Sequence, residues 1–215
     1  MSLRTRIKIC GLTREGDVEA AVGAGADAVG FVFYPASARH IDLARAAELA
    51  RGLPPFVTPV GLFVNAEPAE IARTVAAIPN LLLQFHGDES PADCLRAGRP
   101  FVRAVRMGAQ TPLLDLARRY TDAQALLLDA HVEGYGGGGK VFDWSLVARD
   151  LPCRVVLSGG LHAGNVTDGI LRLRPWAVDV SSGVESAKGI KDAAAMRRFC
   201  DAVRDADARI ADAES

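Results

Sequence analysis

Two patterns of apolar and polar positions alternate along the chain. Short runs rich in Val, Ile, Leu and Phe predict strands, and a segment with apolar residues at helical spacing follows each run. The first strand is predicted at Arg6–Cys10, where Ile7 and Ile9 alternate with Lys8 and Cys10. The other strands are predicted at Ala26–Tyr34, Val57–Val64, Leu81–His86, Phe101–Met107, Ala125–Ala130, Arg154–Leu157 and Ala177–Val180.

Capping residues mark the helices between these strands. The first helix is expected to be capped by Thr13 and to end at Gly23 or Gly25. The later helices are predicted at Leu43–Gly52 after Asp42, at Pro68–Ile78, from Ser90, at Pro112–Tyr120, from Asp143, after Asn165 or Thr167, and from Asp192 to Asp207. The last ~8 residues, rich in Ala and Asp, are expected to fray.

Eight strand–helix units predict an α/β protein. Near-continuous apolar strands are typical of a parallel sheet covered by helices, and eight of them close a (β/α)8 TIM barrel. A doubly wound open sheet is the alternative, but the glycine fingerprint typical of its first turn is missing after Cys10. No change in composition marks a linker, so a single domain is expected over residues 1–215.

The composition narrows the class of protein. Of the 215 residues 49% are hydrophobic, and the net charge is −1, which does not indicate binding to nucleic acid or to a membrane surface. The four cysteines, Cys10, Cys94, Cys153 and Cys200, lack disulfide or metal-ligand spacing, so neither a disulfide framework nor a metal site is expected. We expect a cytoplasmic protein, without signal peptide or membrane span.

The last two strands end in glycine and serine. Strand seven runs into Ser158-Gly159-Gly160 and strand eight into Ser181-Ser182-Gly183. In a barrel of this kind, the loops after these strands commonly bind phosphate through backbone N–H groups and a helix N-terminus. These residues could form only tight turns, but two such ends side by side favour a phosphate site.

Reactive side chains end two strands that lie across the barrel from each other. Cys10 ends strand one just before Gly11, and Asp129 lies near the end of strand six. A lone cysteine in a strand is usually a small buried hydrophobic residue, but a thiol facing a carboxyl across a cavity has the arrangement of a base and an acid. Arg39, in the loop after strand two, is a candidate clamp for a substrate carboxylate.

Other polar residues carry weaker signals. The segment Gly134–Lys140 satisfies a P-loop spacing, but Val141 stands where that motif needs Ser or Thr. A loop that closes over a ligand fits this segment better, since glycine gives it conformational range. Gln84 and His86 share one strand face, and His86 either lines the cavity or is a hydrogen-bonded core residue.

Several motifs, in order and over nearly the whole chain, resemble one family. They are Lys8–Thr13, Gly30–Pro35 with Ser37 and Arg39, Gln84–Gly87, Leu128-Asp129, the glycine loop ending in Lys140–Trp144, Leu157–Leu161 and Asp179–Glu185. Together they resemble phosphoribosylanthranilate isomerase of tryptophan biosynthesis. The resemblance implies an aldose–ketose isomerase that converts N-(5-phosphoribosyl)anthranilate to 1-(2-carboxyphenylamino)-1-deoxyribulose 5-phosphate by an Amadori rearrangement, without a cofactor.

The resemblance also implies residue roles. Cys10 takes the position of the general base, Asp129 that of the general acid, and Arg39 that of the residue binding the anthranilate carboxylate. Phe85 stands where Leu is common and Gly138 where Thr is common, which puts a hydroxyl contact of the glycine loop in doubt. Lys8, His86 and Gly138 are further candidates for substrate contact.

The strand pattern places Lys8 on the same face as Cys10, where positive charge favours a thiolate. Asp179, on the strand that neighbours strand one in a closed barrel, is expected to partly neutralise Lys8.

Three other functions compete with this interpretation: a lyase such as indole-glycerol-phosphate synthase, a non-enzymatic phosphoribosyl-binding module and a bifunctional isomerase. Lysines at strand ends, expected of the lyase, are scarce here, and the paired aspartates of bifunctional isomerases are missing because strand one ends in Cys10. The sequence leaves the oligomeric state open, with a monomer slightly favoured.

Overall fold

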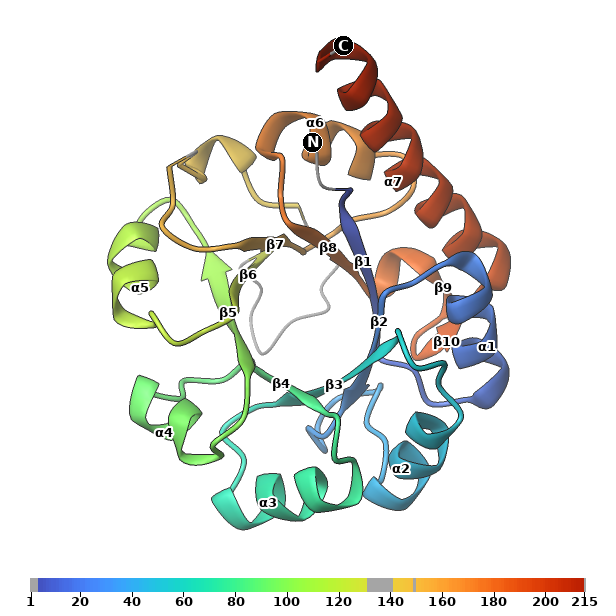
Figure 1. The fold of residues 1–215 in the computed structure, drawn as a ribbon, viewed down its shortest axis with the longest axis vertical. Helices are drawn as coiled ribbons and strands as arrows, with labels where there is room; N and C mark the ends of the chain where they lie inside the picture. The colour runs from blue at the N-terminus through green and yellow to red at the C-terminus, as the bar shows by residue number, and fades with distance from the viewer. Residues whose placement is uncertain (1–3, 131–140, 149, 215) are drawn as a thin grey trace.

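A computed structural model describes residues 4–130, 141–148 and 150–214. Its eight parallel strands follow one another in chain order and close into a barrel, with β8 paired to β1 (Figure 1). The strands are β1 (Arg6–Cys10), β2 (Ala28–Val32), β3 (Thr58–Phe63), β4 (Leu82–Phe85), β5 (Phe101–Met107), β6 (Ala125–Ala130), β7 (Val155–Leu157) and β8 (Ala177–Val180). The predicted (β/α)8 barrel is therefore confirmed, and the open sheet is wrong.

Helices form a ring around the barrel (Figure 1). They are α1 (Glu15–Ala24), α2 (Leu43–Arg51), α3 (Pro68–Ala77), α4 (Pro91–Arg96), α5 (Leu113–Arg119), α6 (Val166–Leu173) and α7 (Ala193–Glu214). The predicted caps at Asp42 and Ser90 form, since their side chains accept hydrogen bonds from the backbone N–H groups of Arg45 and Asp93. Gly25 ends α1 with a φ of 94°, a left-handed conformation that glycine adopts readily.

Two apolar layers surround the strands. The larger layer lies between strands and helices and includes Ile7, Ile9 and Phe85. The smaller layer consists of Val102, Ala104, Ala125, Leu127, Val156 and Ala177. Because side chains alternate along a strand, Lys8 and Cys10 point to the opposite side from Ile7 and Ile9, into the barrel. Phe85 faces the outer layer, so its difference from the family pattern lies away from the barrel interior.

Two expectations about the helices are wrong. The helix expected from Asp143 is only a 3-10 turn, η1 (Trp144–Leu146), after which Val147 is extended. The indole of Trp144 lies next to Gly169 of α6, where a Cβ atom would be 3.2 Å from the ring. Arg14, not Thr13, is the N-cap residue of α1. Asn165 is the N-cap residue of α6, as expected, although its side chain makes no capping bond.

The chain after β8 also differs from expectation. A 3-10 turn, η2 (Ser182–Val184), leads into an antiparallel hairpin of β9 (Glu185–Ala187) and β10 (Ile190–Lys191), which the sequence pattern did not predict. The last helix begins after Asp192 as expected, and the carboxylate of Asp192 accepts a hydrogen bond from the backbone N–H of Ala195. It then runs to Glu214 rather than ending at Asp207. Among the described residues, no helix combines the length and the apolar character that crossing a membrane requires.

Candidate active site

Cys10 lies at the C-terminal end of β1, two residues after an ion pair inside the barrel. The Lys8 ammonium lies 2.8 Å from Oδ1 of Asp179, and both side chains are about nine-tenths buried. Lys8 and Asp179 are direct partners in the β1–β8 register, so barrel closure alone brings them together. The pair predicted from the sequence therefore forms.

The surroundings of Cys10 act on the pKa of its thiol in two opposite directions. Burial raises the pKa of Cys10 above its usual value, and the nearby carboxylate of Asp179 adds to this rise. The ammonium groups of Lys8 and Lys191 act in the opposite direction, since each favours the thiolate. Burial prevails, so the expected positive potential is present but does not bring the pKa of the thiol below its usual value.

Two glycines leave room around Cys10. Gly30 is the register partner of Cys10 on β2, and a Cβ atom there would lie 2.6 Å from Sγ of Cys10. Gly11 follows Cys10 with a φ of 79°, and a Cβ atom on it would lie 2.6 Å from Cδ of Arg39. The thiol and the arginine side chain therefore occupy space that any larger residue at these two positions would fill.

Asp129, on β6, belongs to a chain of buried polar groups. Its Oδ2 lies 3.2 Å from Nε2 of His86, and its Oδ1 accepts a hydrogen bond of 2.9 Å from the N–H of Ala130. The amide nitrogen of Gln84 lies 3.2 Å from Nδ1 of His86. The imidazole therefore lies between the Gln84 amide and the Asp129 carboxyl, with one ring nitrogen facing each. His86 is thus buried and hydrogen-bonded at both ring nitrogens beside Asp129, and its contact with substrate stays a prediction.

Arg39 is held by a carboxylate from the hairpin. Its Nε and Nη2 donate to the two carboxylate oxygens of Glu185 at 2.7 and 2.8 Å. Lys191 donates to the same carboxylate at 2.8 Å. Hydrogen bonding to Glu185 raises the pKa of Arg39, while the carboxyl of Glu185, despite its burial, has a lowered pKa because both cations bond to it.

The glycine–serine ends of β7 and β8 lie next to Asp129 and Cys10. Gly159 and Gly160 have φ angles of 80° and 63°, which favour glycine, and a Cβ atom on Gly159 would lie 3.0 Å from Oδ1 of Asp129. The hydroxyl of Ser181 donates to the carbonyl of Cys10 at 3.0 Å. Ser182 and Gly183 form the start of η2. The candidate phosphate residues are thus adjacent to both candidate catalytic residues.

Two further observations delimit the site. Gly138 and the rest of the glycine-rich loop fall in 131–140, outside the described residues, so its expected contact is not observed. In the parts of the chain that the structure describes, no group of three or more His, Cys, Asp or Glu side chains is arranged to hold a metal ion.

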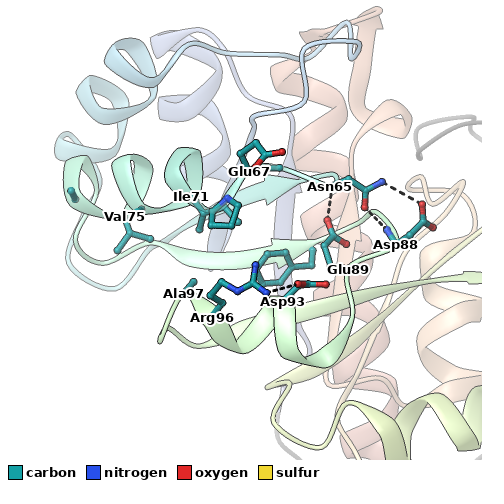
Figure 2. Close-up of a pocket in the computed structure, with 14 residues that line it drawn as sticks. Asn65, Glu67, Ile71, Val75, Asp88, Glu89, Asp93, Arg96 and Ala97 are labelled. Carbon is teal, nitrogen blue, oxygen red and sulfur yellow. Dashed lines mark hydrogen bonds and ion pairs between the residues drawn. The ribbon is translucent and has the colours of Figure 1, made fainter.

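A cavity of about 540 Å³ lies outside the barrel, between α3 and α4 (Figure 2). Ile71 and Val75 line it, and Asn65, Asp88 and Glu89 lie at one end. There the backbone N–H of Asn65 donates to Glu89 at 2.7 Å and that of Asp88 donates to Asn65 at 2.7 Å. These bonds join the loops after β3 and β4, so this end of the cavity supports the loop that follows His86.

Sequence reasoning missed the roles of Glu185, Lys191 and Gly30. Glu185 and Arg39 are 146 positions apart, and neither belongs to a periodic pattern that would pair them. The signal available in the sequence was the scarcity of lysine, since Lys191 is one of only four lysines in the chain. In the structure its side chain is fully buried. A buried lysine requires a carboxylate partner, which points to the neighbouring Glu185.

The fold and the strand ends together define a class of protein. (β/α)8 enzymes build their sites at the C-terminal ends of the strands, and glycine-rich ends on the last two strands are typical of those that act on small phosphorylated substrates. The chain is a barrel enzyme of this class.

Comparison with known proteins identifies the family. The family model for N-(5'-phosphoribosyl)anthranilate (PRA) isomerase matches residues 7–202, and the chain belongs to this family. The N-(5'-phosphoribosyl)anthranilate isomerase of Leptothrix cholodnii is 72% identical over 212 residues, which cover 99% of this chain and 96% of that protein. The activity is therefore that of an aldose–ketose isomerase of tryptophan biosynthesis.

Solved structures agree with this assignment. The phosphoribosyl anthranilate isomerase from Thermotoga maritima is similar with a TM-score of 0.87 and 40% identity, covering 94% of this chain and 99% of that one. A phosphoribosyl anthranilate isomerase in complex with reduced 1-(o-carboxyphenylamino)-1-deoxyribulose 5-phosphate has a TM-score of 0.84 and 38% identity, with the same coverage.

Proposed function

We propose that Cys10 is the general base and Asp129 the general acid of an Amadori rearrangement of N-(5-phosphoribosyl)anthranilate. The observation that carries this proposal is their placement. Cys10 ends β1 and Asp129 lies near the end of β6, on opposite sides of the closed barrel and both directed inward. A substrate bound between them has one group on each side of its reacting carbons.

Ring opening requires a proton on the furanose oxygen. His86 and Asp129 lie within hydrogen-bond distance, so one extra proton can be shared between the imidazole and the carboxyl. We infer that this protonated pair binds substrate and that Asp129 delivers the proton. Gln84 positions the ring through a hydrogen bond at its other nitrogen. Ring opening then leaves an iminium ion between the sugar C1 and the anthranilate nitrogen.

The iminium ion acidifies the hydrogen on C2, which the Cys10 thiolate removes. The enolamine that results tautomerises to the ketone, and exchange with solvent returns Cys10 and Asp129 to their starting protonation states. Lys8 favours the thiolate although burial raises the pKa of the thiol, so its ammonium lowers the cost of forming the base. Asp179 keeps that ammonium in place.

The two ends of the substrate bind to different loops. We propose that Arg39 binds the anthranilate carboxylate and that the backbone of Gly159, Gly160 and Gly183, with the hydroxyls of Ser181 and Ser182, binds the phosphate. Positive φ angles at Gly159 and Gly160 and the turn at η2 support the second part, because turns of this kind can form concave groups of backbone N–H donors that bind anions. Gly138 is a further proposed contact from the glycine loop.

A fluorescence assay of anthranilate-derivative turnover tests the proposal. Cys10→Ala and Asp129→Asn should each lower kcat by roughly 10²–10⁴-fold, the usual contribution of a positioned acid or base. Cys153→Ala is the matched control, since Cys153 is a free thiol outside the barrel interior, before β7, and should leave kcat unchanged. Near-normal turnover in either test variant removes that residue from the mechanism.

We also propose that the chain acts as a single-domain monomer in the cytoplasm. All four cysteines are free, as in a reducing compartment. Large exposed apolar side chains in the described parts are spread over separate elements; examples are Phe56 before β3, Leu95 on α4 and Leu114 on α5. Scattered residues of this kind do not form an interface patch. Light scattering after size-exclusion chromatography tests the monomer, and a dimer mass refutes it.

A further inference from the structure

Glu185 forms a two-point ion pair with the arginine that we assign to substrate binding. The Arg39 side chain is about nine-tenths buried, and that of Glu185 is 6% exposed. A buried carboxylate on a guanidinium either holds it in place or competes with a substrate carboxylate for it. The surrounding contacts decide between these two roles.

The hairpin of β9 and β10 holds Glu185 firmly. Lys191 donates to Glu185, and also to the carbonyl of Ser181 at 3.0 Å. A Cβ atom on Gly189, at the turn of the hairpin, would lie 2.8 Å from the carbonyl oxygen of Ala38, so the hairpin lies directly against the loop that carries Arg39. The N–H of Lys191 donates to Asp17 of α1 at 3.3 Å, which fastens the hairpin on its other side. A carboxylate held in this way is a poor candidate for displacement.

Charge and geometry leave Arg39 able to bind a second carboxylate. Arg39 and Lys191 share the single carboxylate of Glu185, so the group of three retains one positive charge. A guanidinium has five N–H donors in one plane. The Glu185 carboxylate binds the edge of the guanidinium formed by Nε and Nη2. It does not occupy the other edge, formed by Nη1 and Nη2.

We propose that Glu185 is a positioning residue that fixes the plane of Arg39 over Gly11, so that the Nη1–Nη2 edge receives the substrate carboxylate. Lys191 supplies the charge that keeps Glu185 from cancelling the attraction of Arg39. The proposal rests on the proposed role of Arg39 in substrate binding. It makes the β9–β10 hairpin part of the specificity for a carboxylate beside the phosphoribosyl group.

Glu185→Gln tests the proposal, because it keeps the shape but removes the charge and one acceptor. KM for N-(5-phosphoribosyl)anthranilate should rise about tenfold, as expected for a weakened charge-assisted bond, with kcat changed less than about twofold. The inhibition constant of inorganic phosphate, which probes the phosphate site alone, should stay within about twofold. Glu48→Gln is the matched control: Glu48 pairs with Arg45 at 2.7 Å on the exposed face of α2, and its variant should behave as wild type.

A double variant separates positioning from a structural role. If Glu185 acts through Arg39, adding Glu185→Gln to Arg39→Ala should not raise KM further. Should Glu185→Gln unfold, Glu185→Asp replaces it, since the shorter side chain keeps the charge but draws the guanidinium out of place, and the same rise in KM is expected.

Three results overturn the inference. A lower KM in Glu185→Gln means that Glu185 competes with substrate, and an unchanged KM means that Arg39 does not need it. Equal weakening of substrate and inorganic phosphate means that the hairpin merely supports the fold. Failure of the proposed role of Arg39 is distinguishable from all three, because Arg39→Ala alone would then leave KM at the wild-type value.

Discussion

Replacing Gly30 with alanine tests whether the position of the Cys10 thiol matters for catalysis. The new Cβ atom would lie 2.6 Å from Sγ and 3.0 Å from Cα of Cys10, whereas carbon and sulfur atoms in contact are normally separated by more than about 3.5 Å. The thiol must therefore move by roughly 1 Å. A displacement of that size can cost about 10²-fold in rate, and overpacking typically costs about 1–3 kcal/mol of stability.

The assay combines steady-state turnover with urea unfolding. Gly61→Ala is the control, because a Cβ atom there would lie 2.8 Å from Leu81 and 3.0 Å from Phe63, in the outer layer rather than beside Cys10. Both variants should lose similar free energy of unfolding, but only Gly30→Ala should lose about 10²-fold in kcat. Equal kcat values for Gly30→Ala and the wild type would refute the assignment of Cys10 as a precisely placed base.

Two more predictions follow from buried charges. Lys8→Met removes a cation that lowers the pKa of Cys10. The rise of kcat/KM with pH follows the thiolate, so it should move to higher pH, and activity at neutral pH should fall about tenfold if the pKa of Cys10 rises by about one. An unchanged pH profile would exclude Lys8 from this role. Glu89→Gln breaks a pair with Arg103 in which both side chains are about nine-tenths buried, so urea unfolding should show a loss of roughly 3 kcal/mol. A loss below about 1 kcal/mol would show that the pair is dispensable.

The fold and part of the site could be predicted because both follow from short-range patterns. Strand periodicity places Lys8 and Cys10 on one face, and closing eight parallel strands brings β8 beside β1, so the pair of Lys8 with Asp179 needs no further information. The same reasoning places Cys10 opposite Asp129. In such cases the sequence spacing and the strand order together determine which side chains share the barrel interior.

The remaining features depend on packing that no local pattern records. Asp143 carries the signal of a helix cap and does accept a hydrogen bond from the N–H of Ser145, yet only one 3-10 turn follows it, with the ring of Trp144 next to Gly169. The β9–β10 hairpin has strands of three and two residues, too short for alternation to be read. Arg39 and Glu185 meet only because the hairpin folds back over the loop after β2.

The two buried charge groups of the site act on different parts of the reaction. A buried ion pair contributes little net stability, since desolvation offsets the attraction, so the pair of Lys8 and Asp179 is poorly explained as a stabilising device. Its ammonium instead acts on Cys10, whose pKa burial raises. The Glu185 carboxylate bonds to Arg39, whose side chain lies against Gly11, the residue after Cys10. The proposed mechanism therefore assigns one group to the basicity of the thiol and the other to the position of the substrate carboxylate.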